Sequence, residues 1–304
     1  MKVAIVGATG VVGETIARVL QERRTPVERV GLFASRTRDN VQATTPEALR
    51  EYDAVFFASS EDASERYAPE LLERGAVVID NSSTFRMKPG VPLIVPEVNA
   101  HAMRADDRLF PVGNCTAIIL CVALAPVRDV AGLRAVRVAT YQAISGAGRA
   151  ALEEFDRGEG NVVRNVVPQI GSFDDDGYTG EERKVAEETR KVLELPGLPV
   201  YATTVRVPVR TAHSEAVFFE TERGTSVEEL AAAFDRAPGI VFHRDGIVTP
   251  REVEGTDLVH VARLRSCHRD GSEFQMWIVG DQLRKGAATN GVQILELVIS
   301  RRNA

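Results

Sequence analysis

The glycine-rich segment VAIVGATGVVGETIARVL, at residues 3–20, constrains the fold more than any other part of the sequence. Its apolar start predicts a buried strand over 3–6, and apolar residues at helical spacing after residue 13 predict an amphipathic helix. The turn between them carries a G-x-x-G-x-x-G pattern, a close variant of the dinucleotide-binding fingerprint: Gly7, Gly10 and Gly13. Such glycines permit a tight turn and let the backbone approach a pyrophosphate at the helix N-terminus. The segment therefore favours a nucleotide-binding unit.

Strands and helices continue to alternate up to about residue 80. Apolar runs predict strands at 30–34, 53–58 and 76–80, and the segment EDASERYAPELLERG between them is helix-like. This alternation is typical of an α/β fold with a Rossmann-type, doubly wound parallel sheet. Ligands of such sheets bind beyond the strand C-termini. We therefore expect DNSSTFRM, from Asp80 through Arg86, to line the site.

The end of the second strand bears on the choice of cofactor. NAD-binding proteins tend to have Asp or Glu at this position, whereas this chain has hydroxyl and guanidinium groups: Ser35, Arg36, Thr37 and Arg38. These groups suit a 2′-phosphate, so the sequence favours NADP. A solvated surface turn would explain the arginines almost as well, although not their position at the strand end.

The length, charge and cysteine content of the chain exclude several classes of protein. A chain of 304 residues is long enough for about two domains. Its net charge of −6 gives no general attraction to nucleic acid or to an anionic membrane. The first residues are too short an apolar run for a signal peptide or a membrane span. The three cysteines are widely spread and no Cys/His cluster has zinc spacing, so we expect a cytoplasmic protein without a metal site.

The segment VGNCTAIILC, residues 112–121, allows two interpretations of Cys115. A free cysteine is often simply buried in the core. Alternatively, the apolar run after Thr116 predicts a buried helix, and a thiol in its first turn would be a nucleophile, since the helix dipole favours the thiolate. A cysteine nucleophile needs a proton acceptor and donor. His213, between two predicted β segments within 201–222, is a candidate, although a lone histidine is more often structural.

The charged segment YTGEERKVAEETRKVLEL, residues 178–195, has many opposite charges three and four positions apart, a pattern typical of a solvated helix face. The segment AVRVATYQAISGAG, residues 135–148, is predicted to be a strand that ends in small residues. The chain closes with a glycine and polar turn and an apolar helix.

Eight motifs along nearly the whole chain resemble, in order, those of the aspartate-semialdehyde dehydrogenase family: GATGVVG, DNSSTFRM, VPEVNAHA, NCT, YQAISGAG, GYTGEERKVAEETRK, VRVPVRTAHSEAV and DQLRKGAATN. The resemblance implies reversible, NADPH-dependent reduction of L-aspartyl 4-phosphate to L-aspartate 4-semialdehyde and phosphate, in lysine, threonine and methionine biosynthesis. It implies an NADP-binding Rossmann domain at 1–114, completed by a C-terminal helix at 285–304. It also implies an α+β catalytic and dimerisation domain at 115–284.

The resemblance also implies roles for individual residues. The nucleophile would be Cys115, with His213 as acid/base and with Gln142 and Asn114 beside the thiol. Arg206 would bind the substrate α-carboxylate and Glu188 its α-ammonium group. Part of the charged helix would then be a substrate-binding face. The remaining substrate and phosphate contacts would be Arg86, Lys191, Ser145 and Gly146.

The implied cofactor-binding residues combine the glycine turn, the end of the second strand and later polar positions: Gly7, Thr9, Gly10, Val11, Val12, Gly13, Ser35, Arg36, Thr37, Arg38, Ser59, Asn81, Gln282 and Asn290. Inorganic phosphate would be the co-substrate. The implied assembly is a homodimer, with a tetramer as the alternative.

The sequence departs from the family pattern in three places. The turn SRTRDN lacks a glycine, the stretch between Gly148 and Asn165 is short, and PVGNC replaces the usual Asn-Pro-Asn-Cys. Three rival functions remain to be separated from the implied one. They are an N-acetyl-glutamyl-phosphate reductase, a non-catalytic NADP-binding regulator, and a dehydrogenase of free aldehydes. The motifs DNSSTFRM and EETRK argue against the N-acetyl-glutamyl-phosphate reductase. The retained Cys, His, Arg and Gln argue against the non-catalytic regulator. Arg86 and Lys191, which suit a phosphate, argue against the dehydrogenase of free aldehydes.

Overall fold

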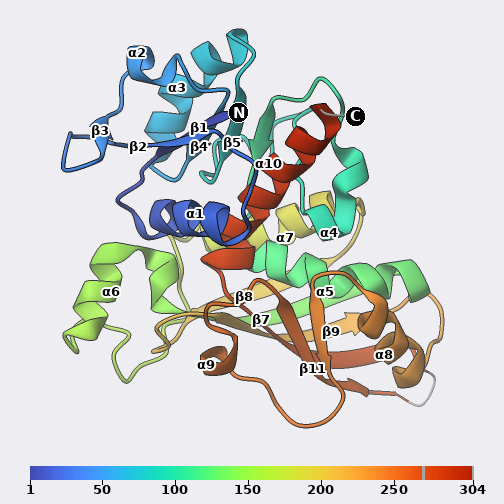
Figure 1. Ribbon diagram of the computed structural model, residues 1–304. Coiled ribbons are helices and arrows are strands. Elements are labelled where there is room, and N and C mark those ends of the chain that lie inside the picture. Colours follow the sequence, from blue (N-terminus) through green and yellow to red (C-terminus); the bar gives the residue numbers. More distant parts are fainter. Residues whose placement is uncertain (269–270, 303–304) are drawn as a thin grey trace. The chain divides into compact units, whose positions relative to one another are not determined.

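The computed structural model describes residues 1–268 and 271–302, and it divides into two compact units (Figure 1). The first unit contains Met1–Gly113 and Ala287–Ala304, and the second contains Asn114–Gly286. The chain therefore enters the second unit immediately before Cys115. It returns to the first unit for its C-terminal helix.

The first unit is built on a six-stranded sheet with the strand order β3-β2-β1-β4-β5-β6. All neighbouring strands are parallel. This is the 3-2-1-4-5-6 order of a doubly wound Rossmann sheet, so the predicted fold class is confirmed. The strands are β1 (Lys2–Val6), β2 (Arg29–Ala34), β3 (Gln42–Ala43), β4 (Ala54–Phe57), β5 (Val77–Asp80) and β6 (Leu109–Pro111).

Helices cover both faces of this sheet. On one face, α1 (Val11–Glu22) contacts α10 (Thr289–Arg302), and Gly291 of α10 lies close to Phe56 and Ile79 of the sheet. On the other face, α3 (Glu61–Glu73) packs its apolar side on β4 and β5. Because both faces are covered, the central strands are continuous apolar runs. The shorter helices are α2 (Pro46–Leu49), α4 (Pro96–Asn99) and the 3₁₀ turn η1 (Ala100–Ala102).

The second unit contains a six-stranded mixed sheet with the order β10-β11-β12-β9-β7-β8. The β7–β8 and β10–β11 pairs are parallel, and the other pairs are antiparallel. This agrees with the α+β architecture predicted for the second domain. The strands are β7 (Ala135–Gln142), β8 (Val200–Arg206), β9 (His213–Glu220), β10 (Ile240–His243), β11 (Val259–Ser266) and β12 (Glu273–Gly280).

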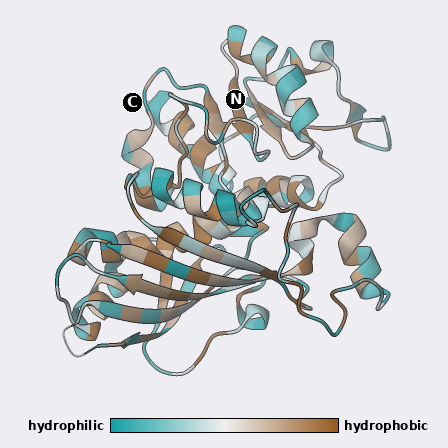
Figure 2. Cartoon of the chain, turned by 180° about the vertical axis from the view of Figure 1, so that it is seen from behind, coloured by the Kyte–Doolittle hydropathy of each residue, from teal (hydrophilic) through white to brown (hydrophobic). Residues whose placement is uncertain are grey.

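The two faces of this sheet have different environments. Three helices pack on one face: α5 (Cys115–Ala131), α7 (Gly180–Val192) and α8 (Val227–Arg236). In β9 the residues on that face are buried, whereas Phe218 on the outer face is 43% exposed. In Figure 2 these strands alternate between brown and paler or teal positions along their length. The other helical segments are α6 (Arg149–Asp156), α9 (Pro250–Val253), η2 (Ile144–Ala147) and the π-helical η3 (Arg284–Ala288).

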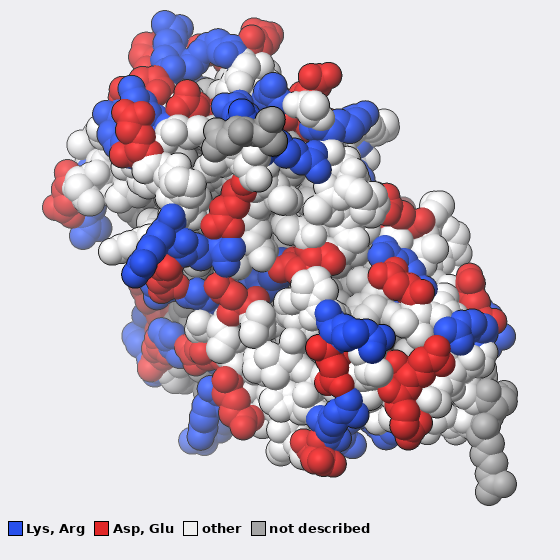
Figure 3. Space-filling view, turned by 45° about the vertical axis from the view of Figure 1, so that its right-hand side comes forward, with Lys and Arg blue, Asp and Glu red and all other residues white. Residues whose placement is uncertain are grey.

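Surface charges of both signs are mixed. On the face in Figure 3, basic and acidic side chains are interspersed. The described residues also form exposed ion pairs, such as Arg183 with Asp174. Among the described residues, none of the helices has the length and apolar composition that a membrane span requires. Within the same residues, no group of three or more His, Cys, Asp or Glu side chains could hold a metal ion.

Candidate active site and nucleotide-binding cavity

Cys115 is the first residue of helix α5 and is partly exposed. Asn114 caps this helix, since its side-chain oxygen accepts hydrogen bonds from the backbone N–H groups of Thr116 and Ala117, both at 3.1 Å. The rest of the helix is nearly all buried Ala, Ile, Leu and Val, which fixes its position. The cap and the core together hold the Cys115 sulfur at the positive end of the helix dipole, where a thiolate is stabilised.

His213, the first residue of β9, faces this sulfur. Its Nε2 lies 3.5 Å from Cys115 Sγ, and its Nδ1 accepts a hydrogen bond of 3.0 Å from the backbone N–H of Ala143. Burial lowers the pKa of His213 well below its ordinary value, and the nearby Arg206 charge lowers it further. The ring is therefore neutral near pH 7, and because Nδ1 is an acceptor, the single ring proton is on Nε2.

Arg206, at the end of β8, is held close to the same pair. Its Nη1 donates to the backbone oxygen of Ala143 at 2.7 Å. Gly146 leaves the space between the two side chains free, because a Cβ atom there would lie 3.1 Å from Arg206 Nη1 and 3.2 Å from His213 Cε1. The structure thus brings together four predicted site residues: Cys115, His213, Arg206 and Gly146.

Gln282 lies in the second unit. The oxygen and the nitrogen of its side-chain amide each form a hydrogen bond with a loop of the site. Its oxygen accepts from the backbone N–H of Ala212 at 2.9 Å, and its nitrogen donates to Ser145 Oγ. Ala212 has a φ of 68°, a left-handed conformation that is unfavourable for a residue with a side chain. Gln282 therefore stabilises the turn immediately before His213, a contact that the sequence did not predict.

Glu181, in the first turn of α7, is a site residue that the sequence analysis missed. One of its carboxylate oxygens accepts a hydrogen bond from the Asn114 amide at 2.9 Å and another from the Gln142 amide at 3.0 Å. Asn114 immediately precedes Cys115, and Gln142 immediately precedes Ala143, whose backbone N–H donates to His213. A signal was present in the sequence, because Glu181 lies seven positions before Glu188, and residues at that spacing share a helix face.

The interpretation of α7 as a solvated face is wrong for one side of the helix. Glu182 and Glu188 are buried, and Glu188 accepts a hydrogen bond of 2.5 Å from the backbone N–H of Asn114. Lys191, one turn later, is partly buried. Desolvation lowers its pKa, and the Glu188 charge opposes that shift. The charged residues that suggested solvent exposure therefore occur on both the exposed and the buried side of this helix.

Gly286 is a second residue that the sequence analysis left without a role. A Cβ atom at this position would lie 2.9 Å from Cys115 Cβ, closer than real side chains approach one another. Any larger residue would displace the Cys115 turn. The motif DQLRKGAATN therefore contributes a close backbone approach beneath the thiol as well as the polar residues predicted from it.

The first unit contains a cavity of about 690 Å³ at the C-terminal ends of its strands. Gly7 has a φ of 86°, and a Cβ there would lie 2.3 Å from the oxygen of Ala58, so glycine is required. No side chain caps the N-terminus of α1 after Gly10, which leaves backbone N–H groups for a phosphate. Five predicted cofactor residues line the cavity: Gly7, Thr9, Gly10, Ser35 and Ser59.

The polar atoms of this region fit a nucleotide. Ser59 Oγ and Asn81 Oδ1 are buried and have no hydrogen-bond partner within the described part of the chain, as expected of groups that bind a ligand. The cavity is also lined by Arg66, whose guanidinium lies over the Tyr67 ring at 5.2 Å. The sequence pattern gives Arg66 no predicted role, because this residue lies mid-helix in α3 and far in sequence from the second strand.

The other predicted cofactor residues lie in several places. Val11 and Val12 begin α1, and Gly13 packs against the Gly7 backbone. Three residues after the second strand are exposed and outside the cavity lining: Arg36, Thr37 and Arg38. Thr37 Oγ1 accepts from Ala43 N at 3.2 Å, and Arg38 lies 3.5 Å from Asp39.

Two buried polar side chains complete the predicted set in the first unit. Arg86, just after β5, donates from Nη2 to the backbone oxygen of Asn81 at 2.9 Å. Asn290, in α10, donates to the oxygen of Ile94 at 2.9 Å. Both belong to a different unit from Cys115. The predicted contact of Arg86 with the substrate phosphate therefore stays a prediction.

Comparison with known families defines the class of protein. Residues 2–105 match the family model described as "Semialdehyde dehydrogenase, NAD binding domain", and residues 124–285 match "Semialdehyde dehydrogenase, dimerisation domain". These matches cover most of both units. The chain is therefore an oxidoreductase of the semialdehyde dehydrogenase class, with a nicotinamide-cofactor-binding domain and a domain associated with oligomerisation.

Individual relatives identify the family within this class. The chain is 39% identical to the aspartate-semialdehyde dehydrogenase of Aquifex aeolicus, over 98% of each protein. It is 35% identical to that of Bacillus subtilis, over 97% of this chain and 96% of the relative. The crystal structure of aspartate semialdehyde dehydrogenase II from Vibrio cholerae, complexed with ASA, superposes with a TM-score of 0.92 at 38% identity, over 98% of each chain. The chain belongs to the aspartate-semialdehyde dehydrogenase family, which confirms the resemblance of the motifs.

Proposed function

We propose that the chain catalyses the reversible, NADPH-dependent conversion of L-aspartyl 4-phosphate to L-aspartate 4-semialdehyde and phosphate, in lysine, threonine and methionine biosynthesis. The observation that carries the proposal is the Cys115–His213 pair, at 3.5 Å, at the N-terminus of a buried helix. Nearly full-length similarity to aspartate-semialdehyde dehydrogenases supports the same reaction. A non-catalytic nucleotide-binding protein would need no such pair.

In this proposal, Cys115 is the nucleophile. The helix dipole and the Nε2–H group of His213 stabilise its thiolate. The sulfur attacks the acyl phosphate, and phosphate leaves to give a thioester. A nicotinamide cofactor held by Gly7, Gly10 and Ser59 would supply the hydride that reduces the thioester. The same Nε2–H group donates to the oxygen that becomes negative when the carbonyl carbon is tetrahedral. Collapse to the aldehyde then releases the thiolate.

Other residues of the second unit would hold the two charged ends of the substrate. Arg206 presents a planar fork to the α-carboxylate, and its fixed contact with Ala143 supports this role. Glu188 would hold the α-ammonium group, and its burial beside Asn114 supports that assignment. Lys191 and Arg86 are the cations proposed for phosphate. Asn114 and Gln142 would orient the carbonyl next to the thiol.

NADP is the proposed form of the cofactor. Ser35 lines the nucleotide cavity, and Arg66 adds a cation to that lining. Both suit a 2′-phosphate better than the 2′-hydroxyl of NAD. The exposed side chains Arg36 and Arg38 would contribute from the turn after β2. Phosphate is the proposed co-substrate of the reverse reaction.

We further propose a homodimer that pairs through the outer face of the second sheet. Tyr201, Arg137 and Phe218 form one cross-strand row on that face, and Tyr201 is 54% exposed. Exposed aromatic residues in a row are typical of protein–protein contacts. The matched dimerisation domain covers the same strands.

The proposed reaction is tested by NADPH formation from L-aspartate semialdehyde with and without phosphate. We expect strong dependence on phosphate, loss of turnover in Cys115→Ser, and near-normal turnover in the control Cys121→Ala, since Cys121 is buried in α5. Turnover independent of phosphate would identify a free-aldehyde dehydrogenase instead. Equal efficiency with N-acetyl-glutamate semialdehyde would identify the acetylated-substrate relative.

A further inference from the structure

A second cavity, of about 260 Å³, adjoins Arg206 on the side of helix α6. Its walls come from η2, α6 and the segments 159–162 and 167–171. Neither Cys115 nor His213 belongs to its lining. The cavity is thus next to the proposed substrate site and shares with it a single charged side chain, Arg206.

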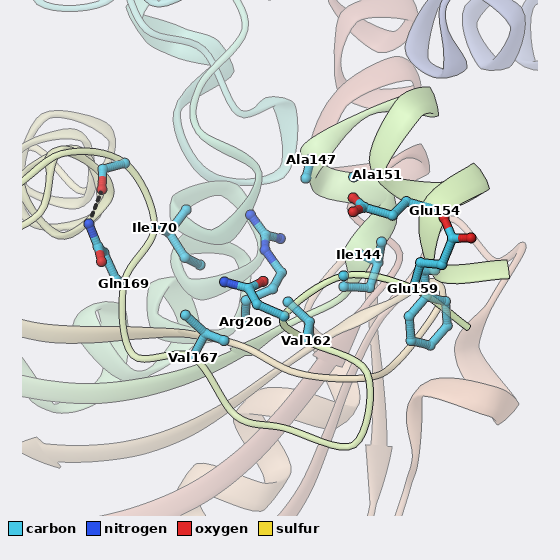
Figure 4. A pocket seen from close by; sticks show the side chains of 14 residues that line it. Ile144, Ala147, Ala151, Glu154, Glu159, Val162, Val167, Gln169, Ile170 and Arg206 are labelled. Atoms are coloured by element: carbon cyan, nitrogen blue, oxygen red, sulfur yellow. Dashed lines mark hydrogen bonds between the residues drawn. The ribbon is translucent and has the colours of Figure 1, made fainter. Parts of the chain in front are cut away.

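The positive side of the cavity is Arg206. Figure 4 shows its side chain entering the cavity from the strand. The backbone of Arg206 pairs with Val167 through two hydrogen bonds, of 2.8 and 3.0 Å, and Nη1 is fixed on Ala143. A guanidinium has five N–H donors in a planar fork, so a fixed Arg206 can bind a carboxylate in the cavity.

The negative side of the cavity is formed by Glu154 and Glu159, which stand on the α6 side in Figure 4. Glu159 pairs with Arg157 at 3.0 Å. Glu154 has no ion pair within residues 1–268 and 271–302. Gly160 gives its carboxyl group room, because a Cβ there would lie 3.2 Å from Glu154 Cδ. The Glu154 carboxylate can therefore accept a cationic group of a ligand.

In Figure 4 the apolar side chains of Ile144 and Val162 lie between Arg206 and the two glutamates, and Val167 and Ile170 line the other side of Arg206. The lining also contains the polar residues Asn161 and Gln169. A cation, an apolar wall and a carboxylate in that order complement a molecule with a carboxylate, an aliphatic chain and an ammonium group. Inorganic phosphate lacks the chain and the positive charge, and a nucleotide lacks the ammonium group. The volume also suits a molecule of amino-acid size.

We propose that this cavity binds a zwitterionic aliphatic amino acid, with its carboxylate on Arg206 and its ammonium group at Glu154, and that this ligand competes with the substrate. The competition rests on the proposed function, in which Arg206 holds the substrate α-carboxylate. The bound amino acid occupies the same guanidinium from the α6 side. The site is therefore inhibitory.

The test uses the whole protein and three probes: 6-aminohexanoate, hexanoate and hexylamine. Calorimetry measures their binding, and initial rates measure their effect on L-aspartate semialdehyde oxidation. We expect 6-aminohexanoate to bind better than either probe that lacks one charge, and to raise KM while kcat is unchanged. Glu154→Gln should weaken its binding about two- to fivefold, the range for an exposed ion pair of up to ~1 kcal/mol. The exposed neighbour Glu153→Gln is the matched control and should bind as the unmutated protein does.

Equal binding of 6-aminohexanoate and hexanoate, an unchanged affinity in Glu154→Gln, or inhibition that lowers kcat alone would each overturn the proposal. Calorimetric binding does not depend on turnover. If the chain fails to oxidise L-aspartate semialdehyde while the binding pattern holds, the proposed reaction fails and the cavity assignment stands. If turnover is normal but the binding pattern is absent, the cavity assignment fails and the proposed reaction stands.

Discussion

The proton of His213 determines what this side chain can do for Cys115. Because the Ala143 N–H donates to Nδ1, the neutral ring presents Nε2–H to the sulfur. Taking up a second proton would place an Nδ1–H group against that N–H donor. His213 is therefore suited to donate a hydrogen bond to the thiolate and the oxyanion. It is poorly suited to remove the thiol proton.

This role predicts different effects for two substitutions. His213→Ala should lower kcat by about 10²–10³-fold, the usual effect of removing an oxyanion donor. In His213→Gln an amide N–H reaches toward the position of Nε2, so kcat should fall much less. Steady-state rates with L-aspartate semialdehyde measure both. If the two variants lose the same activity, His213 acts as an acid/base and the donor assignment is wrong.

The sequence could predict Cys115 but could not show its partners. The apolar run after Thr116 indicated a helix, and the thiol at its start followed from that pattern. His213 lies 98 positions away, at the start of β9, and it meets Cys115 only because α5 packs on the folded second sheet. Glu181 and Gly286 were missed for the same reason. Their roles depend on atoms that approach one another only after the second sheet is formed.

At the level of single elements, helix α7 has one side exposed to solvent and another side that contributes residues to the candidate site. Its Thr179–Glu182 capping box fixes the first turn, which places the Glu181 carboxylate under two amides. The sequence pattern recognised the helix but could not separate its faces, because Glu and Lys occur on both. Charge pairs three or four positions apart are compatible with burial of one side when buried donors satisfy the carboxylates.

We therefore predict that Glu181 is a positioning residue for catalysis. Glu181→Ala removes the shared acceptor of Asn114 and Gln142, and a hydrogen bond to a charged group is worth about 1.5–3 kcal/mol. We expect kcat to fall about ten- to a hundredfold, with little change in KM or melting temperature. Glu187→Gln, on the exposed side of the same helix, should have normal kinetics. A lower melting temperature with unchanged kcat would make Glu181 purely structural.

Two elements border the nucleotide cavity, β2 and α3. Substitutions at Arg36, after β2, and at Arg66, in α3, compare their contributions to the preference for NADP. Arg66 lines the cavity, whereas Arg36 is exposed in the turn. Removing an arginine–phosphate contact costs about 1.5–3 kcal/mol. Arg66→Ala should reduce the ratio of kcat/KM for NADP over NAD by about ten- to a hundredfold, and Arg36→Ala should reduce it less. A ratio near one in the unmutated protein would refute the preference for NADP.

At the scale of the whole molecule, the two sheets differ in how far the sequence specifies them. In the first unit β1, β2, β4 and β5 are each followed in sequence by a parallel neighbour, and the alternation of strands and helices is visible in the sequence. In the second unit β12 pairs with β9 across more than fifty residues, and β10 enters at the edge. Hydrophobic periodicity identifies such strands but contains no information on their order.

The buried carboxyl group of Glu215 couples the stability of the second unit to pH. It lies on β9 two residues after His213, fully buried, and neither oxygen has a hydrogen-bond partner among the described residues. Desolvation raises its pKa well above the ordinary value. In the folded protein Glu215 is therefore protonated over a pH range in which the unfolded chain has already lost that proton. Folding takes up a proton in this range.

The sign of the pH dependence follows from this linkage. The contribution of Glu215 is fully present below the unfolded pKa of about 4.3 and is lost as pH rises toward the folded pKa, by up to about 1.4 kcal/mol per pH unit. We predict that Glu215→Gln, which carries no titratable proton, stabilises the protein increasingly between pH 5 and pH 8. Chemical unfolding at these two values measures the effect, with the exposed Glu153→Gln as control. A stability difference between Glu215→Gln and the unmutated protein that does not grow with pH would mean that Glu215 is ionised in the folded state, and hence that its carboxylate has a partner.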